Sequence, residues 1–289
     1  MAFRTVVVTS RCKLEYSLNY LICRGEDEKR INLSEISTLI IQNVGVAITA
    51  ALLSKLMEAK VKVIFCDPKS NPQGELVSYY DNYGNFGKIK SQLEWQEEDK
   101  KKLWAEVTKA KILNQSRNLG FLHSPKETLL RSYASEVEPG DPTNREGHAA
   151  KVYFLSCFGP SFSRDQTIVT NAYLNYGYSI LLSAINRAVK TLGYLTEFGI
   201  HHIGPTNPFN LSCDFMEPLR AFIDYQVLAK KVEETTYKSY FAGILSEKVL
   251  YRGANMFLEN ALQSYVEGLL LWLNQPSPIF PPFIEYELH

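Results

Sequence analysis

Two stretches of the sequence gather side chains of the types that bind divalent metal ions. NREGHAAKVYF holds Glu146 and His148, and GIHHIGPTNPFNLSCDFMEPLR holds His201, His202, Asp214 and Glu217. Carboxylate oxygens are the ligands that Mg²⁺ and Mn²⁺ prefer, and an imidazole nitrogen shifts the preference toward Mn²⁺. These residue types suggest a site for one of these two cations, although the sequence separates them widely.

The neighbouring residues leave other interpretations open. Asp214 precedes Glu217 by three positions, so the two carboxylates share a face if the segment is helical. The same spacing also fits a capping box ahead of a helix. Pro218 removes an early helical hydrogen bond and favours a special local structure. His201 and His202 precede a Gly-Pro loop, where histidines are more often loop residues than ligands.

Small residues surround Glu146. Ala149 and Ala150 follow it by three and four positions and share its face of a predicted helix, whereas His148 points to a different face. Such a strip of small side chains serves either close helix packing or access for a ligand. The pattern alone does not choose between these two roles.

The first part of the chain, residues 1–85, is predicted to be rich in β-strands. Its candidate strands are TVVV, the run from Leu14 to Cys23 that GEDEKR turns back into INL, STLIIQN, VKVIFCD and, after PKSNPQG, ELVSYY. Between STLIIQN and VKVIFCD, helical spacing places Ile48, Leu52 and Leu56 on one face. This order predicts a buried pair of strands joined by a crossover helix.

Residues 88–289 are predicted to form a second, mostly α-helical domain that carries the candidate metal residues. Leu103, Val107 and Ile112 recur at helical spacing, and later segments repeat the pattern. The final run NQPSPIFPPFIEYELH is rich in proline and is predicted to be an extended tail. The predicted fold class is therefore α+β, with a β-rich N-terminal domain before a helical catalytic domain.

Composition narrows the class of protein without identifying it. Of the 289 residues, 45% are hydrophobic, which is enough for a sizeable core and argues against disorder. The 31 basic and 31 acidic residues balance, which argues against binding nucleic acid by bulk charge. The sequence shows neither a membrane-length apolar run nor a signal peptide, and its five scattered cysteines are typical of reduced thiols. We therefore expect a cytoplasmic protein.

A longer pattern extends beyond the candidate metal residues. It consists of PTNREGHAAKVYF, NYGYSILLS and GIHH…NPFNLSCDFMEPLR, together with RTVVV, INLSEISTLII, VKVIFCD, KILNQS and FSRD. In this order the stretches resemble the CRISPR-associated integrase, the endonuclease of the spacer-acquisition module, and its type II-A branch in particular. The resemblance covers most of the chain and is weakest in the C-terminal tail.

The resemblance implies roles for individual residues. The glutamate of the REGHAA motif is Glu146, the histidine of the G-x-x-H motif is His202, and the second acid, in D-x-M-E-P, is Glu217. These three would be the catalytic residues and the metal ligands, with Asp214 as a nearby acid. The chain reads EPLRA where the family commonly reads EPFRP, a difference that follows the acid and concerns local packing.

The implied activity is metal-dependent DNA integration. In this reaction the 3′-hydroxyl of a captured DNA fragment attacks a phosphodiester at the edge of a CRISPR repeat, with Mg²⁺ or Mn²⁺ as cofactor. The small residues beside Glu146 would let the DNA backbone approach the ion. Two alternatives are a metal-dependent nuclease for branched DNA in repair and an architectural DNA-binding subunit.

The resemblance also implies partners. These are double-stranded DNA (the captured fragment and the CRISPR repeat), a second copy of the chain in a homodimer, a small protein that bridges two dimers, and other type II-A adaptation and effector proteins. The N-terminal domain would supply dimer, partner and DNA contacts. The proline-rich tail would either dock a partner or pack against its own domain.

Overall fold

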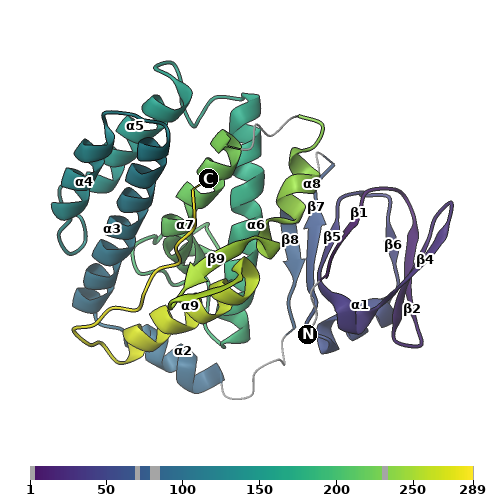
Figure 1. The fold of residues 1–289 in the computed structure, drawn as a ribbon. Coiled ribbons are helices and arrows are strands. Elements are labelled where there is room, and N and C mark those ends of the chain that lie inside the picture. Colours follow the sequence, from purple (N-terminus) through teal and green to yellow (C-terminus); the bar gives the residue numbers. More distant parts are fainter. Residues whose placement is uncertain (1–3, 69–71, 79–84, 230–233, 289) are drawn as a thin grey trace. The chain divides into compact units, whose positions relative to one another are not determined.

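The computed structural model describes residues 4–68, 72–78, 85–229 and 234–288. The chain divides into two compact units, one formed by residues 1–81 and 238–246 and the other by residues 82–237 and 247–289. Strands dominate the first unit and helices the second (Figure 1). The predicted α+β class is therefore confirmed.

The first unit contains a sheet with the strand order β1-β5-β7-β8. Its strands are β1 (Arg4–Val8), β5 (Ile36–Ile41), β7 (Lys62–Cys66) and β8 (Pro72–Leu76). β1, β5 and β7 run parallel, and helix α1 (Ala50–Glu58) connects β5 to β7. The predicted crossover is therefore confirmed, although Ile48 belongs to a strand and not to the helix. The last residues of the predicted strand ELVSYY lie outside the described residues.

A second sheet of this unit has the order β4-β3-β2-β6. Its strands are β2 (Lys13–Ser17), β3 (Tyr20–Arg24), β4 (Glu28–Asn32) and β6 (Ala47–Ile48). We predicted one strand from Leu14 to Cys23, and this is wrong. Leu18 and Asn19 have φ values of 49° and 64°, and such a pair of left-handed residues forms the tight turn of a hairpin.

Apolar residues from both sheets and from α1 form one core. It includes Val8, Leu14, Leu21, Leu39, Leu52, Leu56 and Val63. Burying each of these side chains stabilises the unit by roughly 2 kcal/mol. Ala242 packs with Ile40, Ile64 and Cys66 in a smaller cluster. Residues 238–246, which contain most of α8 (Tyr237–Ala242) and the short helix Ile244–Ser246, therefore belong to the first unit, although the sequence placed them with the helices.

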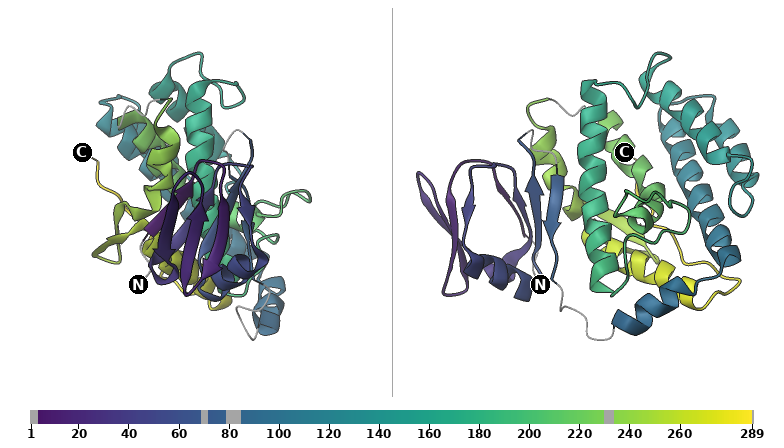
Figure 2. Two further views of the ribbon diagram at one scale, coloured as in Figure 1. Left: turned by 90° about the vertical axis from the view of Figure 1, so that its right-hand side faces the viewer. Right: turned by 180° about the vertical axis from the view of Figure 1, so that it is seen from behind.

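The second unit is built from seven helices along the described residues. They are α2 (Asn85–Leu93), α3 (Glu97–Phe121), α4 (Glu127–Ser135), α5 (Arg145–Phe158), α6 (Val169–Thr191), α7 (Asn210–Ala229) and α9 (Leu258–Asn274). Helix α3 packs against α4, α5 and α7, and Figure 2 shows the same arrangement from behind. Asn114 and Asn118 on α3 donate to the carbonyls of Pro218 and Ala221 on α7, which fixes α3 beside α7.

Two features of the second unit concern its C-terminal part. A hairpin of β9 (Lys248–Tyr251) and β10 (Ala254–Phe257) interrupts the predicted helices, and its turn places Arg252 and Gly253 at positive φ. The proline-rich tail packs against its own unit, because Tyr286 is buried and its carbonyl accepts a hydrogen bond from Arg117 at 2.6 Å. In the described part of the chain, no helix combines the length and the apolar character needed to span a bilayer.

Candidate metal centre

Glu146 lies in the first turn of α5, and two side chains cap that turn. Asn144 accepts a hydrogen bond from the Gly147 amide at 3.1 Å. Asp141 accepts from the amides of Arg145 and Glu146, at 2.8 and 2.9 Å. A helix N-terminus carries partial positive charge, so this position stabilises the carboxylate of Glu146.

The small residues near Glu146 differ in their surroundings. A Cβ atom at Gly147 would lie 2.6 Å from Oδ1 of Asn144, so the capping side chain would have to shift. Ala149 is fully buried in a core cluster with Tyr153. Of the two roles that the sequence left open, close packing therefore accounts for Ala149, which is too deeply buried to line a path for DNA. Gly147 and Ala150 are half-buried, and the role of Ala150 stays a prediction. His148 is exposed.

Glu217 and Asp214 both lie inside α7. The helix begins at Asn210, so the capping-box alternative for Asp214 is wrong. Pro218 has no N–H, which leaves the carbonyl of Asp214 without its helical partner. The Asp214 side chain is fully buried, and that of Glu217 is 5% exposed. Both carboxylates are therefore held by protein groups and not by solvent.

Lys111 on α3 joins the two predicted acidic ligands. Its Nζ donates to Oε1 of Glu146 and to Oε2 of Glu217, and both distances are 2.5 Å. Arg220, one turn after Glu217, donates from Nε to the other oxygen of Glu217 at 2.8 Å. Glu146 and Glu217 are therefore brought together around a cation, as the sequence analysis expected, but that cation is an ammonium group.

These contacts determine the charge of the buried groups. Burial alone would raise the pKa of Glu217, but Arg220 and Lys111 lower it to about 2. Burial alone would lower the pKa of Lys111, but Glu217 and Glu146 raise it above its usual value. At neutral pH, Lys111 and Glu217 are therefore both ionised.

His202 is held by Asp214. Its Nδ1 lies 2.5 Å from Oδ1 of Asp214, and the same oxygen accepts from the His202 amide at 3.0 Å. The second oxygen accepts from the amides of Ile200 and His201, at 2.7 and 3.1 Å. The hydrogen bond to Asp214 raises the pKa of His202. With Nδ1 engaged in this way, Nε2 is the ring nitrogen left to bind a metal ion.

Two further contacts fix the loop that carries His202. The ring of His201 stacks on Trp104, with the ring centroids 4.0 Å apart and the planes 2° from parallel. A Cβ atom at Gly199 would lie 2.6 Å from Oδ2 of Asp214 and even closer to the carbonyl of His202. His201 therefore has a packing role, and glycine is required at position 199.

The three predicted ligands are not all gathered in one cluster. No three His, Cys, Asp or Glu side chains among the described residues lie close enough to hold one metal ion together. Glu146 and Glu217 form a pair, and His202 is near enough for both charges to contribute to raising its pKa. Two carboxylate oxygens that converge on one cation, with an imidazole nearby, fit Mg²⁺ or Mn²⁺ in donor type.

A small cavity of about 160 Å³ lies beside this pair. Its lining includes Lys111, Glu146, Arg164, Tyr178, Glu217, Arg220 and Asp224. Tyr178 donates to Asp224, and burial raises the pKa of Asp224 to about 6. Lys111, Arg220 and Asp224 were not predicted to be site residues. A signal was available for Lys111, which follows Val107 by four positions and therefore shares its predicted buried face.

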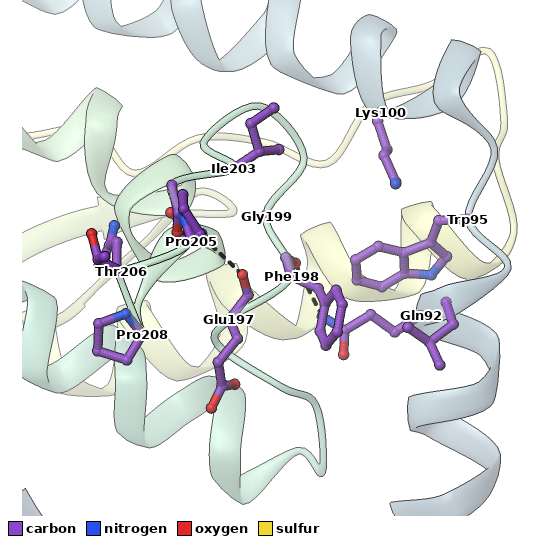
Figure 3. Close-up of a pocket in the computed structure, with 14 residues that line it drawn as sticks. Gln92, Trp95, Lys100, Glu197, Phe198, Gly199, Ile203, Pro205, Thr206 and Pro208 are labelled. Carbon is purple, nitrogen blue, oxygen red and sulfur yellow. Dashed lines mark hydrogen bonds between the residues drawn. The ribbon is translucent and has the colours of Figure 1, made fainter.

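A larger pocket is lined in part by the loop that carries His201 and His202, here called the histidine loop. None of the predicted ligands lines it. Its volume is about 530 Å³, and Figure 3 shows Gln92, Trp95 and Lys100 facing Phe198, Ile203, Pro205 and Pro208 across it. The Gln92 amide donates to the carbonyls of Leu195 and Phe198, at 2.8 and 3.2 Å. Gln92 therefore anchors the beginning of the loop that carries His202.

Comparison with known proteins gives consistent matches. A family model described as CRISPR associated protein Cas1 matches residues 5–252. The CRISPR-associated endonuclease Cas1 of Neisseria meningitidis serogroup C (strain 8013) is 36% identical over 232 residues, which covers 79% of this chain and 76% of that protein.

Two solved structures share the fold. A casposase bound to an integration product has a TM-score of 0.81 at 17% identity, over 98% of this chain and 94% of that chain. A chain of a Cas6-RT-Cas1–Cas2 complex has a TM-score of 0.75 at 17% identity, over 99% of this chain and 37% of that chain. The family model spans most of the sequence and a relative shares over a third of the aligned residues, so this chain belongs to the CRISPR-associated protein Cas1 family.

Proposed function

We propose that this chain is a metal-dependent DNA integrase and endonuclease that joins the 3′-hydroxyl of a DNA fragment to a phosphodiester at the edge of a CRISPR repeat. Family membership supports the class of activity, since the Neisseria relative is named an endonuclease. The observation that carries the proposal is that Glu146 and Glu217, on two different helices, converge on one cation.

In this proposal Glu146, Glu217 and His202 hold one Mg²⁺ or Mn²⁺ ion. A divalent ion bound there would polarise the phosphoryl oxygen and promote loss of the proton from the attacking hydroxyl. Asp214 orients the His202 ring through its hydrogen bond to Nδ1. Arg220 keeps Glu217 ionised and fixed in position, because it binds the oxygen that faces away from Lys111.

The partners in this proposal are double-stranded DNA, a second copy of the chain and a small bridging protein. The fold that this chain shares with a protein from a Cas6-RT-Cas1–Cas2 complex supports a small partner of the Cas2 type. We further propose that residues 1–85 supply dimer, partner and DNA contacts, and that residues 88–289 carry the chemistry. The type II-A assignment stays a prediction from the sequence motifs.

A strand-joining assay tests this proposal. It would combine the purified protein, with and without its small partner, a short duplex with free 3′-hydroxyls and a supercoiled plasmid that carries a repeat. We expect joined product with Mn²⁺ or Mg²⁺, none with chelator, and none with Glu146→Ala, whose fold should stay intact. Glu98→Ala, which changes an exposed glutamate on α3, is the matched control and should join normally. Unchanged strand joining by Glu146→Ala would refute the proposal. Cleavage of the plasmid without joining would favour the nuclease alternative.

A further inference from the structure

The ammonium group of Lys111 lies between the two carboxylates that we propose as metal ligands. Its ammonium nitrogen lies 2.5 Å from one oxygen of Glu146 and 2.5 Å from one oxygen of Glu217. The Lys111 side chain is only 8% exposed, so water does not compete strongly for these hydrogen bonds. An ion that bound both oxygens would therefore have to displace the ammonium group from at least one of them.

The charges around the cavity are already balanced before any ion binds. Its lining contains three cationic side chains, from Lys111, Arg164 and Arg220, and three carboxyl groups, from Glu146, Glu217 and Asp224. Arg220 binds Oε1 of Glu217, whereas Lys111 binds Oε2. Glu217 thus keeps one cationic partner when Lys111 withdraws. Of the two basic residues seen bonded to Glu217, it is Lys111 that also bonds to Glu146.

We propose that Lys111 is a built-in counter-ion, which holds Glu146 and Glu217 together in the metal-free protein and competes with the divalent ion for their oxygens. This inference rests on the proposed metal site. Lys111 keeps its proton throughout and changes only its position. Without it, two carboxylates close together would repel each other, which would destabilise the metal-free form and favour the metal-bound form.

A residue with a merely structural role would behave differently. Loss of a buried ion-pair partner that is equally important in both forms would lower stability with and without metal, and would leave the affinity for metal unchanged or weaker. A competing counter-ion makes the opposite prediction for affinity. Lys111 is therefore argued to be a positioning residue whose removal tightens metal binding.

The test compares Mn²⁺ binding by wild type, Lys111→Met and Lys109→Met. Methionine is unbranched and nearly as long as lysine, and it carries no charge. Lys109 is a matched control, because it lies on the same helix and pairs with a different carboxylate. Its Nζ lies 2.7 Å from Oε1 of Glu106. Isothermal titration calorimetry with Mn²⁺ alone gives the affinity, and thermal unfolding with and without Mn²⁺ gives the stability of each form.

We expect Lys111→Met to bind Mn²⁺ on the order of tenfold more tightly than wild type, since the loss of one nearby positive charge favours a cation in a partly buried site. Its melting temperature should be lower than that of wild type without metal and should rise more on addition of Mn²⁺. Lys109→Met should match wild type in both measurements.

If wild type binds Mn²⁺ and Lys111→Met binds it equally or more weakly, the inference is overturned, but the proposed metal site still stands. Absence of Mn²⁺ binding in both proteins overturns both.

A second variant keeps the test decisive if Lys111→Met does not fold without metal. Adding Glu146→Gln to Lys111→Met removes one negative charge together with the positive one, and Glu217 keeps its bond to Arg220. Recovery of folding in this double variant, or in Lys111→Met refolded with Mn²⁺, supports the counter-ion role. Failure of both to recover overturns it.

Discussion

Asp214 is a buried side chain that organises the loop carrying His202. Its two oxygens accept four hydrogen bonds, from the amides of Ile200, His201 and His202 and from the ring of His202. The sequence placed Asp214 near the second acid but could not show this role, because a helix residue and a distant loop meet only in the folded chain.

Asp214→Asn should weaken both the fold and the activity. The amide NH₂ cannot accept hydrogen bonds, so two of the four donors lose their partner, at a cost of about 1–3 kcal/mol each. We expect the free energy of unfolding in urea to fall by about 2–6 kcal/mol, and strand joining to fall because the His202 ring is no longer oriented. Asp165→Asn, at an exposed position, is the control. Wild-type stability and joining in Asp214→Asn would refute the role.

Asp224 makes a different prediction, which depends on pH. Burial raises the pKa of its carboxyl from 3.8 to about 6, against the lowering effect of its hydrogen bond from Tyr178. A raised pKa in the folded state means that this group favours folding most at low pH, and that the benefit is lost as the pH rises through about 6. The stability of Asp224→Asn relative to wild type should therefore increase from pH 5 to pH 8.

The expected gain between these two pH values is roughly 1 kcal/mol. Urea unfolding of wild type and Asp224→Asn at pH 5 and pH 8 measures it, with Asp165→Asn as the exposed control. A difference that stays constant with pH, or that reverses, would show that the ionised carboxylate is stabilised by the nearby arginines.

Residue types gave a group of acids and histidines that included Glu146, Glu217 and His202, and the family resemblance singled out these three. Lys111 and Arg220 were not selected, since lysine and arginine usually lie on solvated helix faces. The partners of Lys111 lie on other helices and do not follow from spacing in the sequence. Arg220 follows Glu217 by three positions, a spacing that puts both on one helix face, but this pair was not predicted. The structure therefore adds basic side chains to a site for which the sequence indicated acids and histidines.

At the scale of elements, the histidine loop depends on a close approach between backbone segments. Gly199→Ala would place a methyl group 2.6 Å from Oδ2 of Asp214, so the loop must shift. We expect it to lower the free energy of unfolding by about 1–3 kcal/mol and to reduce joining. Gly204→Ala is the matched control in the same loop, since its nearest neighbour would be 3.7 Å away, an ordinary contact. Equal stability of the two variants would contradict this account of the loop.

The strands and helices with strong periodicity were predicted well, and the tight turns were not. The crossover of β5, α1 and β7 follows from two apolar runs around an amphipathic helix. The turns at Leu18–Asn19 and Arg252–Gly253 both use positive φ, and neither Leu nor Arg signals such a conformation. For this reason one long strand was predicted where a hairpin exists, and the β9–β10 hairpin was missed.

At the scale of the whole chain, the sequence pattern was more informative about family than about contacts between distant segments. The order of the motifs indicated the family, and the matches over residues 5–252 agree. The position of the tail did not follow from its prolines. Its burial depends on Tyr286 donating to Asn118 at 2.9 Å, a contact between the two ends of the helical unit's sequence.

The central claim is that Glu146, Glu217 and His202 share one divalent ion. Anomalous diffraction from crystals of the protein grown with Mn²⁺, at a Mn²⁺ concentration that saturates binding in solution, tests it most directly. We expect a peak at bonding distance from the carboxylate oxygens of Glu146 and Glu217 and from a ring nitrogen of His202. A manganese peak that lies elsewhere, with Lys111 still between the two carboxylates, would contradict it.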